Sequence, residues 1–187
     1  MQKQLFAGQT ITLGPIDHEN DPPIISRWSH DLEYLRLVDV KPVYPLSTGQ
    51  VQKQLDALEK EMEESKNAFY FTIRTRPEDR LLGFASIRWI EWTHATGWVR
   101  LGIGDRQDWR QGYGTQALNL MLEYAFNELN LYRVGAEIIE YNQGARRLFE
   151  KAGFHEEVRR RQALSRDGRR WDVLLYGLLS QEWEAGT

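Results

Sequence analysis

The clearest chemical signal in the chain is one loop, Trp109-Arg110-Gln111-Gly112-Tyr113-Gly114-Thr115. Gly112 and Gly114 lack Cβ atoms, so the backbone there can turn sharply and approach a ligand closely. A helix is expected from Thr115 to Asn130, and the first N–H groups of a helix have no intrahelical partner. These N–H groups, the helix dipole and the charge of Arg110 together suit an anion. We therefore predict that this loop holds a pyrophosphate group.

Two other phosphate motifs fit this loop less well. The P-loop ends in Gly-Lys followed by Ser or Thr, and the chain has no such sequence at this helix start. The G-x-G-x-x-G dinucleotide fingerprint lacks its third glycine here. A nucleotide-binding protein of another fold stays as an alternative that these absences disfavour.

A second stretch, Asn142 to Phe154, follows one predicted strand later and reads N-Q-G-A-R-R-L-F-E-K-A-G-F. Together the two segments resemble the acetyl-CoA-binding core of the GNAT acetyltransferase superfamily. That family's loop reads Q/R-x-x-G-x-G/A, and its later helix reads N-x-x-A-x-x-x-Y-E-K-x-G-F. The tail from Gly168 to Trp183 resembles the RimJ/RimL-type branch, which includes N-terminal acetyltransferases of ribosomal proteins. The chain departs from the family at Trp109, where Gln or Arg is usual, and at Phe149, where a tyrosine often acts as general acid.

The resemblance implies one N-acetyltransferase domain over residues 1–187, of α/β class. Its three-layer GNAT-like fold would have a central mixed, mostly antiparallel, splayed sheet flanked by helices. The implied reaction moves an acetyl group from acetyl-CoA to a primary amine, on a protein N-terminus or a small molecule, without a metal. The alternative is a catalytically weak CoA-binding module that acts as a sensor or binds a partner. The predicted CoA contacts are Leu101, Gly102, Ile103, Arg110, Gln111, Gly112, Tyr113, Gly114, Thr115 and Asn142.

The general base is harder to assign from sequence. A lysine-type amine has a pKa of about 10.4 and is mostly charged at neutral pH, so it must lose a proton. Many relatives use a glutamate on the strand before the loop, but that strand offers no carboxylate here. The candidates are Glu91 and His94 at the preceding turn and Glu137 on the next strand, with water as a further possibility. We lean to Glu91, because the family more often uses a carboxylate and this turn can lie near the thioester.

The group that protonates the CoA thiolate is also open. Phe149 has no acidic proton, so water or another tyrosine, such as Tyr141, would have to protonate the thiolate. Three tryptophans, Trp89, Trp92 and Trp98, cluster around the turn before the loop. We interpret them as core or interface packing, with the wall of an acceptor pocket as the alternative.

The remaining elements must position these residues. Seven strands are expected at Gln9–Leu13, Ala68–Thr75, Leu82–Ile90, Thr96–Gly104, Arg133–Tyr141, Glu156–Leu164 and Trp171–Leu179. Besides the helix after the loop, helices are expected at Ile24–Ser29, after a Ser47/Gln50 capping box to about Ser65, and after Asn142. By resemblance, the segment Val40–Pro45 borders the acceptor site. Gly102 and Gly104 would weaken an ordinary central strand, which suggests that this strand splays against a ligand.

Composition narrows the class of protein. Of 187 residues, 41% are hydrophobic and 27% charged, which is typical of a globular domain. The net charge of −3 does not favour nucleic acid as a partner, and the absence of cysteine excludes disulfides and thiolate zinc sites. Without a long apolar run, we expect a cytoplasmic protein with no membrane partner, which is either a monomer or a homo-oligomer. Six arginines between residues 159 and 170 form either a solvated hairpin edge or a surface for an acidic partner.

Overall fold

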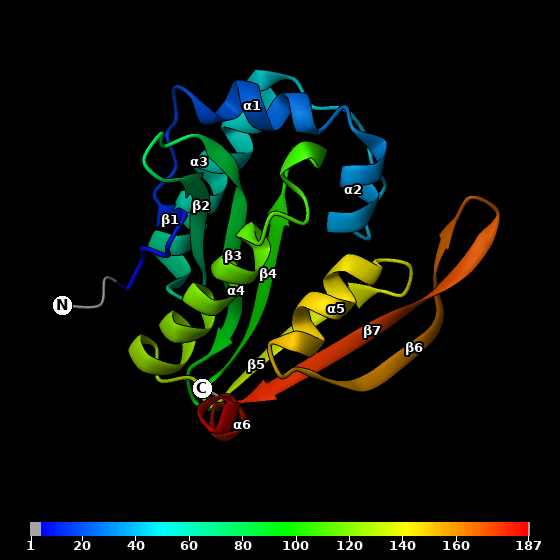
Figure 1. Cartoon of the computed structure of the whole chain (residues 1–187). Coiled ribbons are helices and arrows are strands. Elements are labelled where there is room, and N and C mark those ends of the chain that lie inside the picture. The colour runs from blue at the N-terminus through cyan, green and yellow to red at the C-terminus, as the bar shows by residue number, and fades with distance from the viewer. Residues whose placement is uncertain (1–4, 187) are drawn as a thin grey trace.

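The computed structural model describes residues 5–186. These residues fold around a seven-stranded sheet with the order β1-β2-β3-β4-β5-β7-β6. β4 and β5 run parallel, and the other neighbouring strands are antiparallel. The predicted mixed, mostly antiparallel sheet flanked by helices is confirmed (Figure 1). The strands are β1 (Ile11–Gly14), β2 (Phe69–Thr75), β3 (Leu81–Glu91), β4 (Thr96–Ile103), β5 (Arg133–Ile139), β6 (His155–Arg166) and β7 (Arg169–Leu179).

Helices cover both faces of the sheet, with α4 and α5 in front and α3 behind (Figure 1). The α-helices are α1 (Asp21–Trp28), α2 (Leu32–Val38), α3 (Thr48–Ser65), α4 (Tyr113–Glu123), α5 (Gln143–Lys151) and α6 (Ser180–Gly186). A short 3₁₀ turn, η1 (Arg106–Asp108), precedes α4, and a π-helical segment, η2 (Tyr124–Glu128), continues it. Within the described residues, no helix combines the length and the apolar character needed to cross a bilayer.

The core lies mainly between the sheet and α4. Ala117, Leu118 and Met121 are fully buried on α4, because they share one face of a 3.6-residue period. They join one hydrophobic cluster with residues of both ends of the sheet, such as Ile73 and Leu174. Ala117 also stands at the third position of the dinucleotide fingerprint, which tolerates alanine. The mostly antiparallel sheet, rather than this residue, therefore argues against a dinucleotide-binding fold.

Helix caps explain where several elements begin. Ser47 and Gln50 form the predicted capping box at the start of α3. Sequence reasoning missed α2, although Asp31 caps it by accepting N–H bonds from Glu33 and Tyr34. An Asp directly before an apolar residue is a typical start signal for a helix. The short length of α2, seven residues, left too little periodicity to detect.

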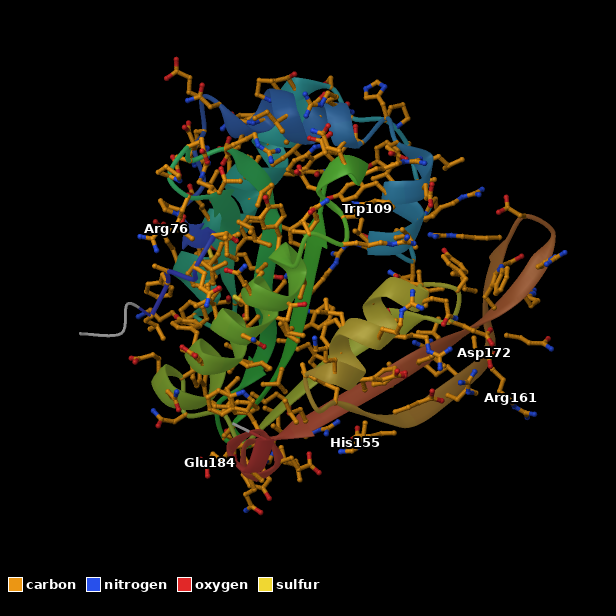
Figure 2. All side chains as sticks on the ribbon, in the orientation of Figure 1. Arg76, Trp109, His155, Arg161, Asp172 and Glu184 are labelled. Carbon is orange, nitrogen blue, oxygen red and sulfur yellow. The ribbon has the colours of Figure 1, made fainter. Side chains whose placement is uncertain are left out.

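The arginine-rich hairpin of β6 and β7 bends toward α2. Arg166 donates to the carbonyl of Arg36, and Arg36 forms two bonds of 2.7 Å with Asp167. Arg159 lies 3.0 Å from Asp172, which is visible on the hairpin with Arg161 (Figure 2). Part of the basic run is thus neutralised within the fold.

Candidate active site

β4 and β5 lie side by side only briefly before they separate. Residues 96–98 pair with residues 133–135, and the pairing between the two described strands ends at Trp98 and Gly135. The ring of Trp98 lies directly over Gly135, because a Cβ atom added at Gly135 would approach that ring to 2.9 Å. Trp98 therefore lies at the end of the paired segment. Beyond this segment β4 and β5 diverge (Figure 1).

The backbone of β4 offers hydrogen-bonding groups to this gap. The N–H of Gly104 donates to a β3 carbonyl at 2.8 Å. Because successive residues of a strand point their backbone groups to opposite edges, Gly102 also bonds toward β3, whereas Leu101 and Ile103 face the gap. The indole Nε1 of Trp109 donates to the Ile103 carbonyl at 2.9 Å. Of the β4 residues predicted to contact CoA, Leu101 thus has both backbone groups directed into the gap.

Trp109 itself lies between the end of β4 and α2 (Figure 2). It packs against the small cluster that contains Trp28 and Tyr34, and the guanidinium of Arg106 lies 6.0 Å from its ring centre. Trp109 therefore holds the end of β4 in place.

α4 begins at an open backbone turn. Gly112 precedes the helix with a φ of 86°, and a Cβ atom added there would meet no atom within 4 Å. Arg110 also has a positive φ, 63°, and an exposed side chain. The N–H of Gln116 bonds to the Gly112 carbonyl, so the N–H groups of residues 113–115 lie at the start of the helix without a helical partner. These N–H groups and the charge of Arg110 suit an anion.

The structure brings the predicted loop residues together in this turn and the first helical turn: Arg110, Gln111, Gly112, Tyr113, Gly114 and Thr115. A Cβ atom at Gly114 would lie 3.6 Å from Leu148 of α5 and 3.8 Å from Leu101 of β4. Gly114 therefore faces the space between β4 and α5, which continues the gap between the strands.

Packing within the protein explains two other glycines. A Cβ atom at Gly104 would approach the Trp28 ring to 2.0 Å, and one at Gly102 would lie 2.9 Å from Phe84. Both glycines make room for aromatic side chains of the fold. They carry no separate signal for a ligand, although the strand does splay as expected.

A cavity of about 510 Å³ opens where β4 and β5 diverge, and we call it the inter-strand cavity. Its volume is within the usual range for small-molecule sites. Both strands, the start of α5 and the segment after α2 line it with, among others, Trp98, Val99, Arg100, Leu101, Glu137, Ile138, Asn142, Ala145 and Phe149. The cavity therefore joins the β4 and α5 residues that sequence reasoning linked to CoA.

Asn142, the N-cap of α5, and Phe149 within α5 take structural roles in this lining. Asn142 caps the helix, because its Oδ1 accepts the N–H of Ala145 at 3.0 Å, and its Nδ2 donates to the Leu37 carbonyl at 3.1 Å. The predicted cap is confirmed. Phe149 is 5% exposed and packs edge-on against Phe154, with ring centres 5.0 Å apart. Neither Phe149 nor Phe154 can donate a proton to a thiolate.

Tyr141, the suggested proton donor, has its hydroxyl engaged elsewhere. The hydroxyl donates to the Arg36 carbonyl at 2.8 Å and accepts a bond from Arg166. Tyr141 does not line the inter-strand cavity. Its geometry fits a link between α2 and the hairpin rather than a role in proton transfer.

The three candidate bases lie in different surroundings. Glu91 ends β3 and His94 follows in the turn, and both are exposed and outside the lining of the inter-strand cavity. That turn adjoins the paired, closed end of β4 and β5. Glu137 does line the cavity, with Oε2 3.5 Å from Nη1 of Arg160. The preference for Glu91 thus has no support from the geometry.

The three tryptophans near this turn separate into two groups. Trp89 and Trp98 line the inter-strand cavity. Trp89 is 63% exposed and has a φ of 51° at the bulge in β3. Trp92 instead donates from its indole to the Lys66 carbonyl at 3.1 Å. Two of the three therefore take the position of a pocket wall.

A second cavity of about 510 Å³ lies between the sheet and helices α1, α2 and α3, and we call it the helix-side cavity. The segment Val40–Pro45, expected to border an acceptor, contributes to its lining. The two cavities share six lining residues, Val38, Asp39, Lys41, Ser86, Arg88 and Arg100. Molecules bound in the two cavities would therefore meet beside β3 and β4.

Two tyrosines of the helix-side cavity remain protonated at neutral pH. Burial raises the pKa of both Tyr34 and Tyr70 far above the usual phenol value of about 10. The charge of Arg100 opposes this shift in both cases. These phenols can donate or accept hydrogen bonds, but they do not act as bases.

Comparisons with known proteins agree with this geometry. Residues 10–155 match the family model described as an acetyltransferase (GNAT) domain. The Bacillus subtilis protein named Probable N-acetyltransferase YjcK is 29% identical over 157 residues, which cover 82% of this chain and 84% of that protein. YdaF of the same species, provisionally named a ribosomal N-acetyltransferase, is 38% identical over 74 residues, or 40% of each chain.

Solved structures share the fold. The spermidine N-acetyltransferase of Vibrio cholerae, solved with CoA and spermine, has a TM-score of 0.80, and the match covers 95% of this chain and 99% of that one. The sequence identity is 19%, so this similarity concerns the fold alone.

Proposed function

The chain belongs to the GNAT acetyltransferase family, and from this premise we propose that it transfers the acetyl group of acetyl-CoA to a primary amine across the junction of its two cavities. The phosphates of CoA bind the turn before α4, and the thioester arm enters the inter-strand cavity. The amine arrives through the helix-side cavity. The separation of β4 from β5 beside the open turn of α4 is the observation that carries this proposal.

The open turn fits a diphosphate by its shape and its charge. A Cβ atom would occupy the space above Gly112, which glycine leaves free. The helical N–H groups of residues 113–115 and the side chain of Arg110 supply donors and positive charge there. Acidic side chains would not suit this position, and the turn from Arg110 to Thr115 contains none.

Leu101 is the residue of β4 best placed to serve the thioester. Its backbone groups face the gap, where they can bond an extended ligand as a neighbouring strand would. A backbone N–H directed at a developing oxyanion typically contributes about 3 kcal/mol to catalysis. This contribution needs no special side chain, which is consistent with the apolar lining near Leu101.

Proton transfers fall to the groups that line the cavity. Glu137 is the candidate base that reaches the inter-strand cavity, so we assign it the proton of the amine. The buried ring of Phe149 closes the other side and offers no proton. Water therefore returns a proton to the thiolate, since a CoA thiol needs only a weak acid.

The proposal is tested by incubating the protein with acetyl-CoA and a panel of primary amines. We expect amine-dependent release of free thiol, together with N-acetylated product detected by mass spectrometry. If acetyl-CoA binds in calorimetry but no amine increases thiol release over hydrolysis, the protein is a CoA-binding module rather than a transferase for these amines.

A further inference from the structure

The lining of the helix-side cavity bears on the choice of the acceptor amine. Its floor consists of side chains on one face of three neighbouring strands. Tyr70 pairs with Ser86, and Ser86 pairs with Arg100, so these residues form a row across β2, β3 and β4. Arg88 lies two residues along β3 on the same face, because side chains alternate along a strand. Two arginines thus stand on the floor, at the end shared with the inter-strand cavity.

The acidic groups of this cavity are already paired. Glu61 accepts two bonds from Nη2 of Arg88, at 2.8 and 2.6 Å. Asp39 accepts a bond of 3.1 Å from Nη2 of Arg100. Neither carboxylate is free to bind an ammonium group without giving up its arginine.

The two arginines, in contrast, keep donors in reserve. Nε of Arg88 is buried and has no hydrogen-bond partner among the described residues. The bonds described for Arg100 all come from Nη2, to Val38 and Asp39, while its side chain is 44% exposed. Each guanidinium carries five N–H donors, so both are only partly satisfied.

The charges in the cavity contrast with those of the whole chain. Arg88, Arg100 and Lys41 face two acidic residues, Asp39 and Glu61, in the lining. The lining therefore has a positive surplus, although the chain has a net charge of −3. A polyamine, which carries several ammonium groups, would meet a net repulsion here. A carboxylate would find the bidentate donors that arginine presents.

The rest of the cavity is aromatic and apolar. Phe84 stacks on Tyr70 with ring centres 5.8 Å apart, and the Arg100 guanidinium lies 5.4 Å above the Phe84 ring. Tyr34 and Leu55 cover this floor from the helices. Such walls suit an apolar or aromatic body beside the charged end of a ligand.

We propose that the acceptor is an amine that carries a carboxylate and an apolar body in the same molecule, and that Arg88 and Arg100 bind the carboxylate. This inference rests on the proposed function. The bound carboxylate holds the amine near the junction of the two cavities, where the thioester arm ends. The neighbouring guanidinium groups also lower the pKa of an ammonium, which eases the loss of its proton.

The first experiment compares acceptors that differ in one group. Phenylalanine and phenethylamine share an amine and an aromatic body, but only phenylalanine has a carboxylate. We expect kcat/KM for phenylalanine to exceed that for phenethylamine by about 10-fold or more, as charge-assisted hydrogen bonds commonly give. Spermidine should be the poorest of the three.

A peptide amide that begins Met-Glu, set against one that begins Met-Lys, distinguishes a protein N-terminus from a free amino acid as the source of the carboxylate.

The second experiment removes the arginines. Arg100→Gln and the double variant Glu61→Gln/Arg88→Gln, which leaves no unpaired carboxylate, should each lower kcat/KM for phenylalanine by about 10-fold or more. The value for phenethylamine should change much less. The matched control is Glu157→Gln/Arg133→Gln, because Arg133 and Glu157 are also joined by two hydrogen bonds, and this arginine is equally exposed, 29%, and lies outside both cavities.

The outcomes separate the inference from the proposed function. A higher kcat/KM for spermidine than for phenylalanine and both peptides would overturn the inference and leave the transferase activity intact. Equal losses for phenylalanine and phenethylamine in the arginine variants would also overturn it, because the arginines would then act on folding or on the thioester. Absence of transfer to every amine, with acetyl-CoA still bound, would instead contradict the proposed function.

Discussion

At the residue scale, Gly112 decides how closely a ligand can approach the start of α4. Its φ of 86° lies in the left-handed region, and the space above its Cα is open. A side chain at this position would be strained and would also fill the space that the helical N–H groups face. Another glycine offers a control, because Gly168 in the β6–β7 turn has a φ of 68° and equally open surroundings.

We predict that Gly112→Val lowers the affinity for acetyl-CoA by at least about 10-fold, since the added side chain would exclude several phosphate contacts. Gly114→Val should act in the same direction, because its added atoms point toward Leu101 and Leu148. Gly168→Val carries similar backbone strain and should keep the wild-type affinity. Calorimetric titration of the folded variants measures this. Unchanged affinity in both Gly112→Val and Gly114→Val would contradict the predicted pyrophosphate site.

Arg110 is expected to act through its charge. It is exposed beside the open turn, so its removal should not disturb the core. We predict that Arg110→Ala weakens binding of acetyl-CoA by about 3- to 10-fold, as expected for one exposed charge pair with a phosphate. The loss should shrink for an acetylated pantetheine that lacks phosphates. Arg169→Ala, an exposed arginine of the hairpin, serves as the control, and equal losses for both ligands would point to a different role.

Glu137 is the candidate base that faces the inter-strand cavity. A base must be deprotonated to accept the proton of the amine, so the rate of transfer should fall at acidic pH. We predict that Glu137→Gln removes this acidic limb from the pH–rate profile and keeps the affinity for CoA. Glu91→Gln and His94→Ala, at the exposed turn, should retain the limb. If one of these two variants loses it instead, the base is at the turn and Glu137 has another role.

At the element scale, α2 connects the two cavities. Val38, the last residue of α2, and Asp39 and Lys41 just after it line both of them. Asp31 fixes the start of α2, because its side chain caps the helix and also forms two bonds of 2.6 Å with Arg106. The position of α2 therefore depends on the ion pair between Asp31 and Arg106 of η1.

The ion pair makes part of the stability dependent on pH. The guanidinium of Arg106 lowers the pKa of Asp31 from 3.8 to about 2. Because the pKa is lower in the folded state, the contribution is complete above the unfolded value and disappears as the pH falls toward 2. We predict that Asp31→Asn, which can still cap the helix, lowers Tm at pH 7 by about 2–4 °C and has little effect near pH 2. Glu64→Gln, in an exposed pair with Lys60, should show no such pH dependence, and the same Tm loss at both pH values would contradict the ion-pair explanation.

At the scale of the whole molecule, the sheet is continuous although β4 and β5 pair over only three residues. The hydrophobic cluster bridges this weak point, since it includes Ile73 and Leu82 on one side and Leu174 and Leu178 on the other. A shared core generally unfolds as one cooperative unit. The two halves of the sheet should therefore behave as one domain.

We predict a single thermal transition, with equal calorimetric and van't Hoff enthalpies. Acetyl-CoA at 100 times its Kd should stabilise the folded state by about 2.7 kcal/mol and raise Tm by about 5–10 °C, still in one step. The Gly112→Val variant should show a smaller shift at the same ligand concentration. Two separate transitions would show that the halves on either side of β4 and β5 unfold independently.

Local sequence patterns predicted most elements of the fold and marked the loop before α4 as a candidate anion site. The turn at Gly112, the Ser47 cap and the strand periodicities depend on neighbours along the chain, so local patterns predict them. The resemblance to the GNAT family added the mixed sheet and the expected cofactor contacts. The same local reasoning failed at α2, whose seven residues are too few for a periodic signal.

Which polar residues share a cavity depends on tertiary packing rather than on neighbours along the chain. Glu91 and Glu137 are both carboxylates that the sequence makes candidate bases. The pairing of β4 with β5 places Glu91 at the closed end of the gap and Glu137 in the cavity lining. The meeting of Arg88 and Arg100 with Glu61 likewise depends on strand register and on the packing of α3. Contacts of this kind join residues distant in sequence, and their free energies depend on burial and geometry that no local pattern contains.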